Sequence, residues 1–248
     1  MRSNAFSEAR KSLFIFALIL IGCILFYLVA SMFTSMGYKA YHTSSTPYDN
    51  SKYITVVVDP GHGGEDPGAF SDLNLLEKDI NLDIASKLND FLVSFGYNSI
   101  LTRTEDKLLY SDNVKGTKKR QDLENRVEIA NKSNADCFIS IHMNKYPAEY
   151  CRGLQTFYSN NSNASAILAE SIQKSSTVLQ TYNNRKIKDG TGTIFVLENL
   201  KIPAVLIECG FLSNNYEATE FSNEEYRRKM AFSIFCGISN FWEMQNET

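Results

Sequence analysis

The chain has few prolines and no excess of positive charge. Five prolines and thirteen glycines among 248 residues are too few for a collagen-like or low-complexity chain, and an aromatic content of 12% favours a packed core. Lysine and arginine number 25 against 28 aspartates and glutamates, which gives a net charge of −3. Nucleic-acid binding depends mainly on neutralising phosphates, so this charge balance argues against DNA or RNA as a partner.

The chain also lacks the cysteine framework of a small secreted protein. It contains no CxxC pair, and the spacing of its cysteines matches no disulfide framework. Unpaired cysteine is among the most buried residue types, so we expect these residues to be small hydrophobic side chains, with two disulfides among the last four as the alternative. The five are Cys23, Cys137, Cys151, Cys209 and Cys236.

Charge is absent from one long apolar segment near the N-terminus, residues 13–33. A helix of these 21 residues would be about 30 Å long, the thickness of the hydrocarbon core of a bilayer. Two basic residues directly precede the segment, and the positive-inside rule therefore places residues 1–12 in the cytoplasm. The prediction is a membrane anchor at 13–33, a polar tether at 34–52 and one extracytoplasmic domain at 53–248.

Two alternatives to a retained anchor stay open for this segment. A cleaved signal peptide would leave the domain secreted, although signal peptides have shorter apolar regions of about 7–15 residues. Residues 20–23 also resemble the lipobox of bacterial lipoproteins, with Cys23 as the lipidated residue. All three interpretations place the same domain outside the cytoplasm.

Strand and helix patterns alternate through residues 53–248. Short β-branched or apolar runs bounded by turn residues predict strands, and apolar residues at helical spacing predict helices. The alternation favours an α/β fold, a mostly parallel sheet flanked by helices, preceded by one N-terminal transmembrane helix. The predicted strands are 53–58, 98–102, 137–141, 153–158, 194–197 and 204–207, and the predicted helices are 77–95, 120–132, 164–179 and 224–242.

Two of the three histidines follow predicted strands. His62 lies four residues after one buried strand and His142 directly after another, whereas His42 lies in the tether. The carboxyl ends of parallel strands share one edge of a sheet, and neutral imidazole is a common metal ligand. The placement therefore indicates a metal site, with an ordinary hydrogen-bonded loop histidine as the alternative at each position.

Two carboxylates are predicted at the same edge. Glu208 directly follows the predicted strand 204–207, and Glu77 opens the first long helix. Two histidines and Glu77 would leave a fourth position on a metal ion for water, as in hydrolytic zinc sites, and Glu208 would then serve as general base and acid. Position alone is equally compatible with a glutamate that stabilises a helix start and with an exposed strand end.

Several ordered motifs resemble those of the zinc-dependent N-acetylmuramoyl-L-alanine amidases, which are bacterial cell-wall hydrolases. The first is VDPGHGGEDPGA at 58–69, and the others follow through the predicted domain in the family's order. They are EKD at 77–79, LTR at 101–103, Arg126, AN at 130–131, AD at 135–136, SIHMN at 140–144, VL at 196–197 and PAVLIECGFLSN at 203–214. Many family members carry glycine where this chain has Asn74.

The resemblance implies a ligand set and a reaction. One zinc ion would be bound by His62, Glu77 and His142, with Glu208 as the catalytic carboxylate. The substrate would be peptidoglycan, cut at the amide between the lactyl group of N-acetylmuramic acid and the L-alanine of the stem peptide.

Four residues near these motifs are weaker site candidates. Asp59 and Asp66 would hold the first of the two histidines in position, with loop hydrogen bonding as the alternative for each. Asn144 would orient the second histidine or touch substrate, with a turn-forming role as the alternative. Arg126 is expected to form a surface ion pair rather than a clamp on substrate.

The predicted architecture narrows the expected role. A single catalytic domain on a membrane anchor, without a repeated wall-binding module, most resembles the spore-cortex amidases of endospore formers. In those proteins, amidase action prepares muramic acid for conversion to the δ-lactam that is recognised at germination. An activating protein partner is compatible with this resemblance. The alternative functions are a zinc carboxypeptidase-like hydrolase and a non-catalytic wall-binding or activating protein on an amidase-like scaffold.

Overall fold

The computed structural model describes Ile24, residues 53–110 and residues 116–246. Contacts between residues divide the chain into two units, Met1–Lys52 and Tyr53–Thr248, and the second unit contains all the strands described below.

A six-stranded sheet with the strand order β2-β1-β3-β6-β4-β5 forms the centre of the second unit. β-Branched residues dominate its first strand, TVVVDP, and all six residues of that strand are buried. Neighbouring strands are parallel except for β4 and β6, which are antiparallel. The strands are β1 Thr55–Pro60, β2 Asn98–Leu101, β3 Cys137–Asn144, β4 Gln155–Tyr158, β5 Lys188–Asp189 and β6 Ala204–Phe211.

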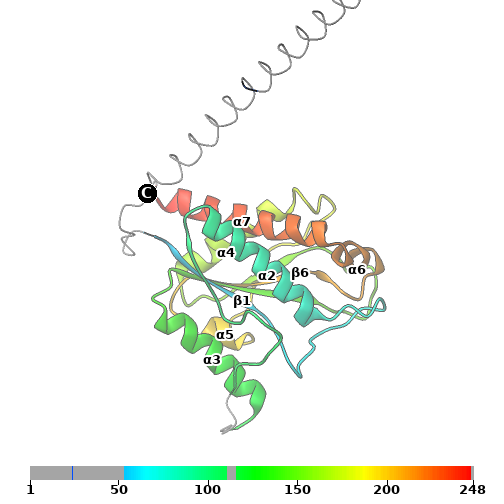
Figure 1. The fold of residues 1–248 in the computed structure, drawn as a ribbon, viewed down its shortest axis with the longest axis horizontal. Coiled ribbons are helices and arrows are strands. Elements are labelled where there is room, and N and C mark those ends of the chain that lie inside the picture. The colour runs from blue at the N-terminus through cyan, green and yellow to red at the C-terminus, as the bar shows by residue number, and fades with distance from the viewer. Residues whose placement is uncertain (1–23, 25–52, 111–115, 247–248) are drawn as a thin grey trace, which may run out of the picture. The chain divides into compact units, whose positions relative to one another are not determined.

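Helices cover both faces of the sheet (Figure 1). Helices α2, α4 and α7 lie on one face, called the α7 face below, and α3 and α5 lie on the other, called the α3 face. Apolar residues at helical spacing, such as Ile80, Ile84 and Leu88 of α2, are buried against the sheet. The helices are α2 Glu77–Ser94, α3 Lys118–Lys132, α4 Asn163–Ser176, α5 Phe195–Glu198, α6 Asn215–Ser222 and α7 Glu224–Asn246.

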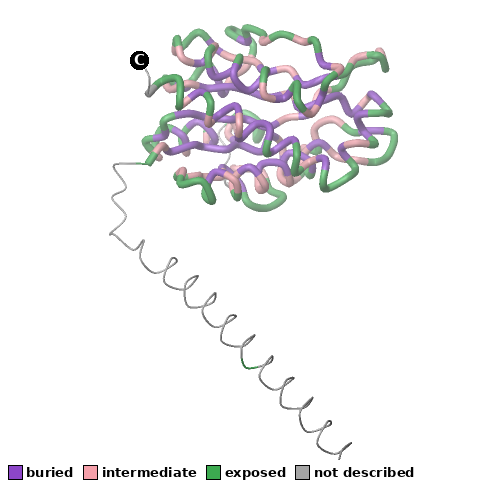
Figure 2. The backbone as a smooth tube through the Cα atoms, turned by 90° about the horizontal axis from the view of Figure 1, so that it is seen from above, coloured by how far each residue is buried: buried purple, intermediate pink, exposed green. Residues whose placement is uncertain are grey.

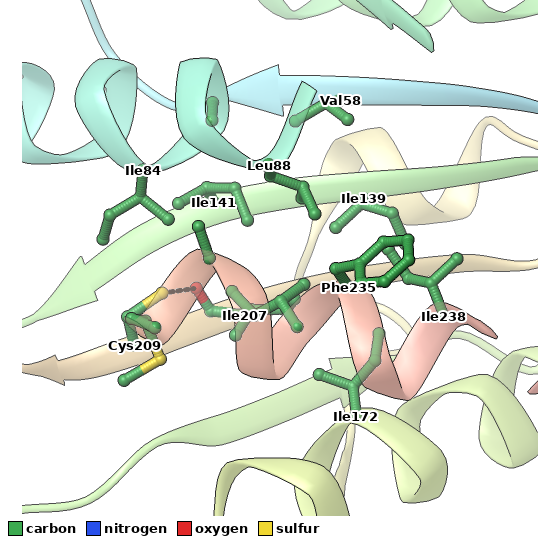
Figure 3. Packing of buried hydrophobic residues seen from close by; sticks show 14 of the residues in the cluster. Val58, Ile84, Leu88, Ile139, Ile141, Ile172, Ile207, Cys209, Phe235 and Ile238 are labelled. Carbon is green, nitrogen blue, oxygen red and sulfur yellow. Dashed lines mark hydrogen bonds between the residues drawn. The ribbon is translucent and has the colours of Figure 1, made fainter. Parts of the chain in front are cut away.

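The two faces of the sheet carry different side chains because successive residues of a strand point in opposite directions. In β3, Ile139 and Ile141 pack on the α7 face, where Figure 3 shows them beside Ile84 and Leu88 of α2. Phe138 of the same strand belongs to a smaller apolar cluster on the α3 face. The buried backbone accordingly follows the strands and the inner sides of the helices (Figure 2).

The sheet flanked by helices matches the predicted α/β architecture, but one predicted strand is wrong. Residues 194–197 were expected in the sheet, and the structure instead forms the short helix α5 there. A four-residue apolar run fits either element. Here the side-chain amide of Asn161 donates to Leu197 O and Glu198 O, the free carbonyls at the end of this helix.

The transmembrane part of the fold prediction is contradicted, because no helix among the described residues is long and apolar enough to cross a membrane. The longest described helix, α7, has 23 residues but carries charged side chains toward both ends, among them Glu224, Arg227 and Glu243. Apart from Ile24, the segments 13–33 and 34–52 lie outside the described residues.

Four cysteines lie in the described part of the chain, and none of the four forms a disulfide. Cys137 and Cys209 are fully buried in the core of the α7 face, as predicted. Burial raises the pKa of both thiols, which keeps them protonated and unreactive. Cys151 and Cys236 are half-buried, and Cys23 lies outside the described residues.

Candidate active site

The loop after β1 carries His62 at the carboxyl edge of the sheet. Gly61 N donates a hydrogen bond of 3.0 Å to Ile141 O of β3, which ties the loop to the sheet. His62 then adopts a φ of 60°, a left-handed conformation that is uncommon outside glycine. A methyl group on Gly61 would lie 2.2 Å from the ring of His142, so only glycine lets the two histidine-bearing segments approach this closely.

Glu77 is the first residue of α2. The loop between β1 and α2 brings it back to the carboxyl edge of the sheet, where His62 lies. The backbone N–H of Glu77 donates to Ala69 O at 2.9 Å, and Ala69 N–H donates to Glu77 Oε2 at 2.7 Å. Met143 N–H of β3 donates to Glu77 Oε1 at 3.0 Å. Backbone donors from the loop and from the sheet therefore hold this buried carboxylate in one orientation.

The structure brings the three predicted metal ligands together. Glu77 Oε1 lies 3.1 Å from His62 Nε2 and 2.9 Å from His142 Nδ1, and the three residues offer donor atoms within 4.8 Å of one another. The imidazole rings meet edge to face with centroids 5.0 Å apart. Donor atoms of a tetrahedral zinc site with bonds of about 2.0–2.2 Å stand about 3.3 Å apart. The observed separations therefore fit a divalent metal ion.

Electrostatics in this cluster favour an ionised Glu77. Burial raises the pKa of its carboxyl, but hydrogen bonds and charge from His142 and His62 outweigh burial and hold the pKa well below its usual range. Burial lowers the pKa of His62, and contacts with Glu77 and Asp66 outweigh burial and raise it. A carboxylate that stays ionised between two imidazoles is a group that attracts a cation.

Glu208 lies beside the cluster, on β6. It is the register partner of His142 across the parallel pair of β3 and β6, so the two side chains share one face of the sheet. Oε2 of Glu208 is buried, and no hydrogen bond reaches it from the described residues. Burial raises the pKa of this carboxyl to about 7, with His142 opposing the rise and Glu77 adding to it. Such a group can both accept and donate a proton near neutral pH.

Arg126 is buried, which corrects the expected surface ion pair. Its side chain is only 2% exposed, with Nη1 at 2.6 Å from Asp59 Oδ1 and Nε at 2.8 Å from Asp122 Oδ2. Two buried carboxylates require a partner charge, and the guanidinium is drawn inward to supply it. Nη2 of Arg126 also donates to His62 O at 2.9 Å. The ion-pair network therefore supports the backbone of the loop that carries His62.

Of the two aspartates predicted to hold His62, one contacts its ring. Asp66 Oδ2 lies 2.9 Å from His62 Nδ1. Asp59 instead accepts hydrogen bonds from Thr102 Oγ1 at 2.6 Å and Ser140 Oγ at 2.8 Å, besides its pairing with the buried arginine. Burial raises the pKa of Asp59, but the arginine charge and these hydrogen bonds outweigh it and keep the pKa below its usual value.

Asn144 lies at the end of β3, where the register with β6 shifts. His142 pairs with Glu208, whereas Asn144 pairs with Phe211, so β6 has one extra residue in this interval. Such a bulge changes the alternation of side chains and places Phe211 on the same face as Glu208. The backbone carbonyl of Asn144 accepts a hydrogen bond of 2.8 Å from Leu212 N.

Two buried residues that hold the site were not predicted as site residues. Arg103 donates from Nε to Pro60 O at 2.9 Å and from Nη2 to Gly61 O at 3.0 Å. Asn81 Nδ2 donates to the same Gly61 carbonyl at 3.2 Å. The sequence held a signal for each, because Arg103 lies in the LTR motif and Asn81 is one helical turn beyond Glu77.

A cavity of about 250 Å³ opens beside the two histidines on the α3 face. Its lining includes His62 and His142, the apolar side chains of Ile194 and Phe195, and Lys119. A cavity that combines apolar walls with convergent polar groups is typical of a substrate site.

Two imidazoles that line a cavity, with the carboxylates of Glu77 and Glu208 next to them at the carboxyl edge of parallel strands, form an arrangement that metal-dependent hydrolases use. The chain belongs to the N-acetylmuramoyl-L-alanine amidase family, whose sequence profile matches residues 56–240. The family prediction made from the motifs is thus confirmed.

Individual relatives point to the same family. The chain is 38% identical to the germination-specific N-acetylmuramoyl-L-alanine amidase of Bacillus subtilis, over 75% of this chain and 79% of that protein. Its structure is similar to the CwlD amidase from Clostridioides difficile, solved in complex with the GerS lipoprotein, with a TM-score of 0.73, 40% identity and coverage of 77% and 99%. It is also similar to the amidase AmiC2 of Nostoc punctiforme, with a TM-score of 0.67, 30% identity and coverage of 77% and 97%.

Proposed function

We propose that this chain is a zinc-dependent amidase that hydrolyses the amide between N-acetylmuramic acid and the L-alanine of peptidoglycan stem peptides. The observation that carries the proposal is the convergence of His62, Glu77 and His142, whose donor atoms lie within 4.8 Å of one another, with Glu208 in register beside His142. Imidazole nitrogen and carboxylate oxygen suit zinc. Membership of the amidase family supports the choice of substrate.

In the proposed reaction, zinc supplies Lewis-acid chemistry and Glu208 of the chain transfers the proton. Zinc, when bound by the two histidines and Glu77, supplies a Lewis acid that polarises the amide carbonyl and makes water acidic enough to attack near neutral pH. The carboxylate of Glu208 takes a proton from the attacking water as the oxygen–carbon bond forms. The same carboxyl then gives the proton to the alanine nitrogen as the carbon–nitrogen bond breaks. The products are a lactyl carboxyl group and a free stem peptide.

Neighbouring residues orient the ligands. Asp66 faces Nδ1 of His62 at 2.9 Å, on the opposite side of the ring from Nε2, which faces Glu77. A carboxylate in that place fixes the tautomer and the ring orientation of a ligating histidine. Arg126 holds the carbonyl of the same residue. These contacts make the ligand set rigid before substrate arrives.

We further propose that the enzyme acts on the spore cortex, on the extracytoplasmic side, and that its product leads to muramic δ-lactam. The 38% identity to a germination-specific amidase supports this role. A protein partner is part of the proposal because a structural relative was solved in complex with a lipoprotein. Expression in a spore former that lacks its own germination-specific amidase should restore muramic δ-lactam in the cortex. Cortex without lactam, with or without a co-expressed lipoprotein partner, would contradict this role.

The substitution Glu208→Gln tests the enzymatic proposal. It keeps the size of the side chain but removes the group that moves the proton, so the rate of amide hydrolysis should fall by at least about a hundredfold. Zinc content should stay near that of the wild type because Glu208 is not a proposed ligand. The measurement combines metal analysis with mass spectrometry of digested peptidoglycan. Glu243→Gln, an exposed glutamate of α7, is the matched control and should leave the rate unchanged.

Three results would contradict the proposal. Full activity in protein freed of metal would exclude the zinc chemistry. Unchanged wall digestion by Glu208→Gln would remove the proposed acid and base. Cleavage of peptide bonds within the stem, instead of release of whole stem peptides, would favour a carboxypeptidase-like hydrolase.

A further inference from the structure

Arg185 is a half-buried cation that forms no ion pair within residues 53–110 and 116–246, although its charge acts to lower the pKa of Glu208. Its Nη2 donates to the neutral amide oxygen Gln155 Oε1 at 2.5 Å, and the guanidinium lies 5.0 Å from the centre of the Phe211 ring. Its Nε is buried without a hydrogen-bond partner among the described residues. Buried charges in proteins are normally paired, and the buried arginines Arg103 and Arg126 make several hydrogen bonds each. In the part of the chain that the structure describes, the Arg185 side chain makes one hydrogen bond and no ion pair.

The position of Arg185 relates it to the site. Gln155 is the register partner of Glu208 across the antiparallel pair of β4 and β6, and Glu208 is the register partner of His142. The three side chains therefore form a row across neighbouring strands about 4.8 Å apart, on one face of the sheet. Arg185 contacts the far end of this row. The β6 bulge puts Phe211 on that face as well, where its ring supports the guanidinium.

The segment that carries Arg185 is held firmly. Arg185 N donates to Asn183 Oδ1 at 3.0 Å, and Arg185 O accepts from Gln173 Nε2 at 3.1 Å. Asn183 and Gln173 are themselves buried. The segment that carries the charge is therefore already ordered, so little conformational entropy is lost when a ligand group binds the guanidinium.

We propose that Arg185 binds a carboxylate of the stem peptide, on the alanine side of the amide that is cut. The inference rests on the proposed function. In a muramoyl peptide the lactyl carboxyl group forms the amide with L-alanine and carries no charge. The anionic groups near the amide that is hydrolysed are therefore the carboxylates of the peptide. Guanidinium is the side chain that best matches a carboxylate, with several donors in one plane. Arg185 would thus set the direction of the substrate, with the peptide over β4 and the muramoyl sugar toward the cavity beside His62 and His142.

The test uses two soluble muramoyl peptides that differ in one group. In one substrate the carboxylate on the residue after L-alanine is free, and in the other it is a primary amide. Wild-type enzyme with zinc should favour the free carboxylate in kcat/KM by about ten- to a hundredfold, the usual effect of a hydrogen bond to a charged group. Arg185→Gln should lose most of this preference, chiefly through KM for the carboxylate substrate. Arg185→Lys should retain part of it.

Arg228→Gln is the matched control, because this arginine is exposed on α7 and pairs with Glu225. It should leave both the rates and the preference unchanged. A preference that survives in Arg185→Gln, or an equal loss on both substrates in Arg185→Gln and Arg185→Lys, would overturn the role of Arg185. Failure of the proposed function gives a different result, namely no cleavage of either substrate by the zinc-loaded wild type.

Discussion

The two faces of the sheet are built for different purposes. On the α7 face, β3 and β6 present Ile139, Ile141, Ile207 and Cys209 to helices α2, α4 and α7, and these side chains belong to the larger apolar cluster of the protein. On the α3 face, the intervening positions of the same strands carry Ser140, His142 and Glu208. One strand thus contributes to a hydrophobic core with alternate residues and to the site with the others.

This difference separates stability from function. Buried apolar surface supplies most of the folding free energy, and the larger apolar core lies on the α7 face. On the α3 face, the ion pairs of Arg126 with Asp59 and Asp122 occupy space that apolar side chains could fill. Such buried ion pairs contribute little to the net free energy of unfolding compared with a hydrophobic core. What this network does provide is a fixed backbone under His62.

The largest expected effect on stability comes from Arg126→Met. The substitution leaves two carboxylates buried without their partner charge, which costs about 3–5 kcal/mol. Metal affinity should also fall, because the His62 carbonyl loses its donor. Urea unfolding and zinc titration measure the two effects. Lys132→Met on the same helix is the control: its exposed pair with Glu128 is worth at most about 0.5 kcal/mol. Equal effects of the two substitutions would refute the proposed role of the network.

A somewhat smaller effect is expected from Leu88→Ala on the α7 face. Leu88 is fully buried between α2 and the sheet, and truncating such a residue costs about 3 kcal/mol. The specific activity of the folded protein should stay near that of the wild type, because the apolar cluster that contains Leu88 includes none of the proposed ligands and not Glu208. Activity per folded molecule is measured below the unfolding transition. A loss of specific activity as large as that of Arg126→Met would show that the two faces are not separate.

Acid should weaken the α3 face in a way that depends on Asp59. Its pKa in the folded protein lies below the ordinary value of 3.8, so its stabilising contribution is fully present well above pH 3.8 and is lost as the pH falls through the folded pKa. The urea midpoint of the wild type should therefore fall more steeply between pH 6 and pH 3 than that of Asp59→Asn. Carboxylates common to both proteins, such as Asp83, cancel in the comparison. Parallel curves for the two proteins would contradict this assignment.

Local sequence pattern predicted the long elements well because their signals are local. The apolar spacing of Ile80, Ile84 and Leu88 specifies α2 whatever packs against it. The strand expected at 194–197 failed because four apolar residues carry no period, and contacts from Asn161 decide the outcome. Two-residue β5 and the bulge in β6 depend on pairing with other strands, and no local pattern specifies such pairing.

The candidate site was predictable where it depends on strand ends and motifs. His62, His142 and Glu208 were placed by strands that end at one edge, and the structure brings them and Glu77 together. Their roles stay predictions until the metal is measured. The burial of Arg126 was not predictable, because an arginine on a helix is usually at the surface. Only the folded structure shows that the carboxylates of Asp59 and Asp122 are buried beside it and require a positive charge.

The smallest expected effect concerns Asn74, in the loop that joins β1 to α2 and positions Glu77. Asn74 has a φ of 58°, a left-handed conformation that glycine and asparagine adopt most easily. Asn74→Gly should therefore change the free energy of unfolding by no more than about 0.5 kcal/mol and leave activity intact. Asn74→Val should cost about 1–2 kcal/mol, because a branched side chain clashes in this conformation. If both variants lost activity without losing stability, the Asn74 side chain would be in contact with substrate, and the loop would belong to the site rather than to its support.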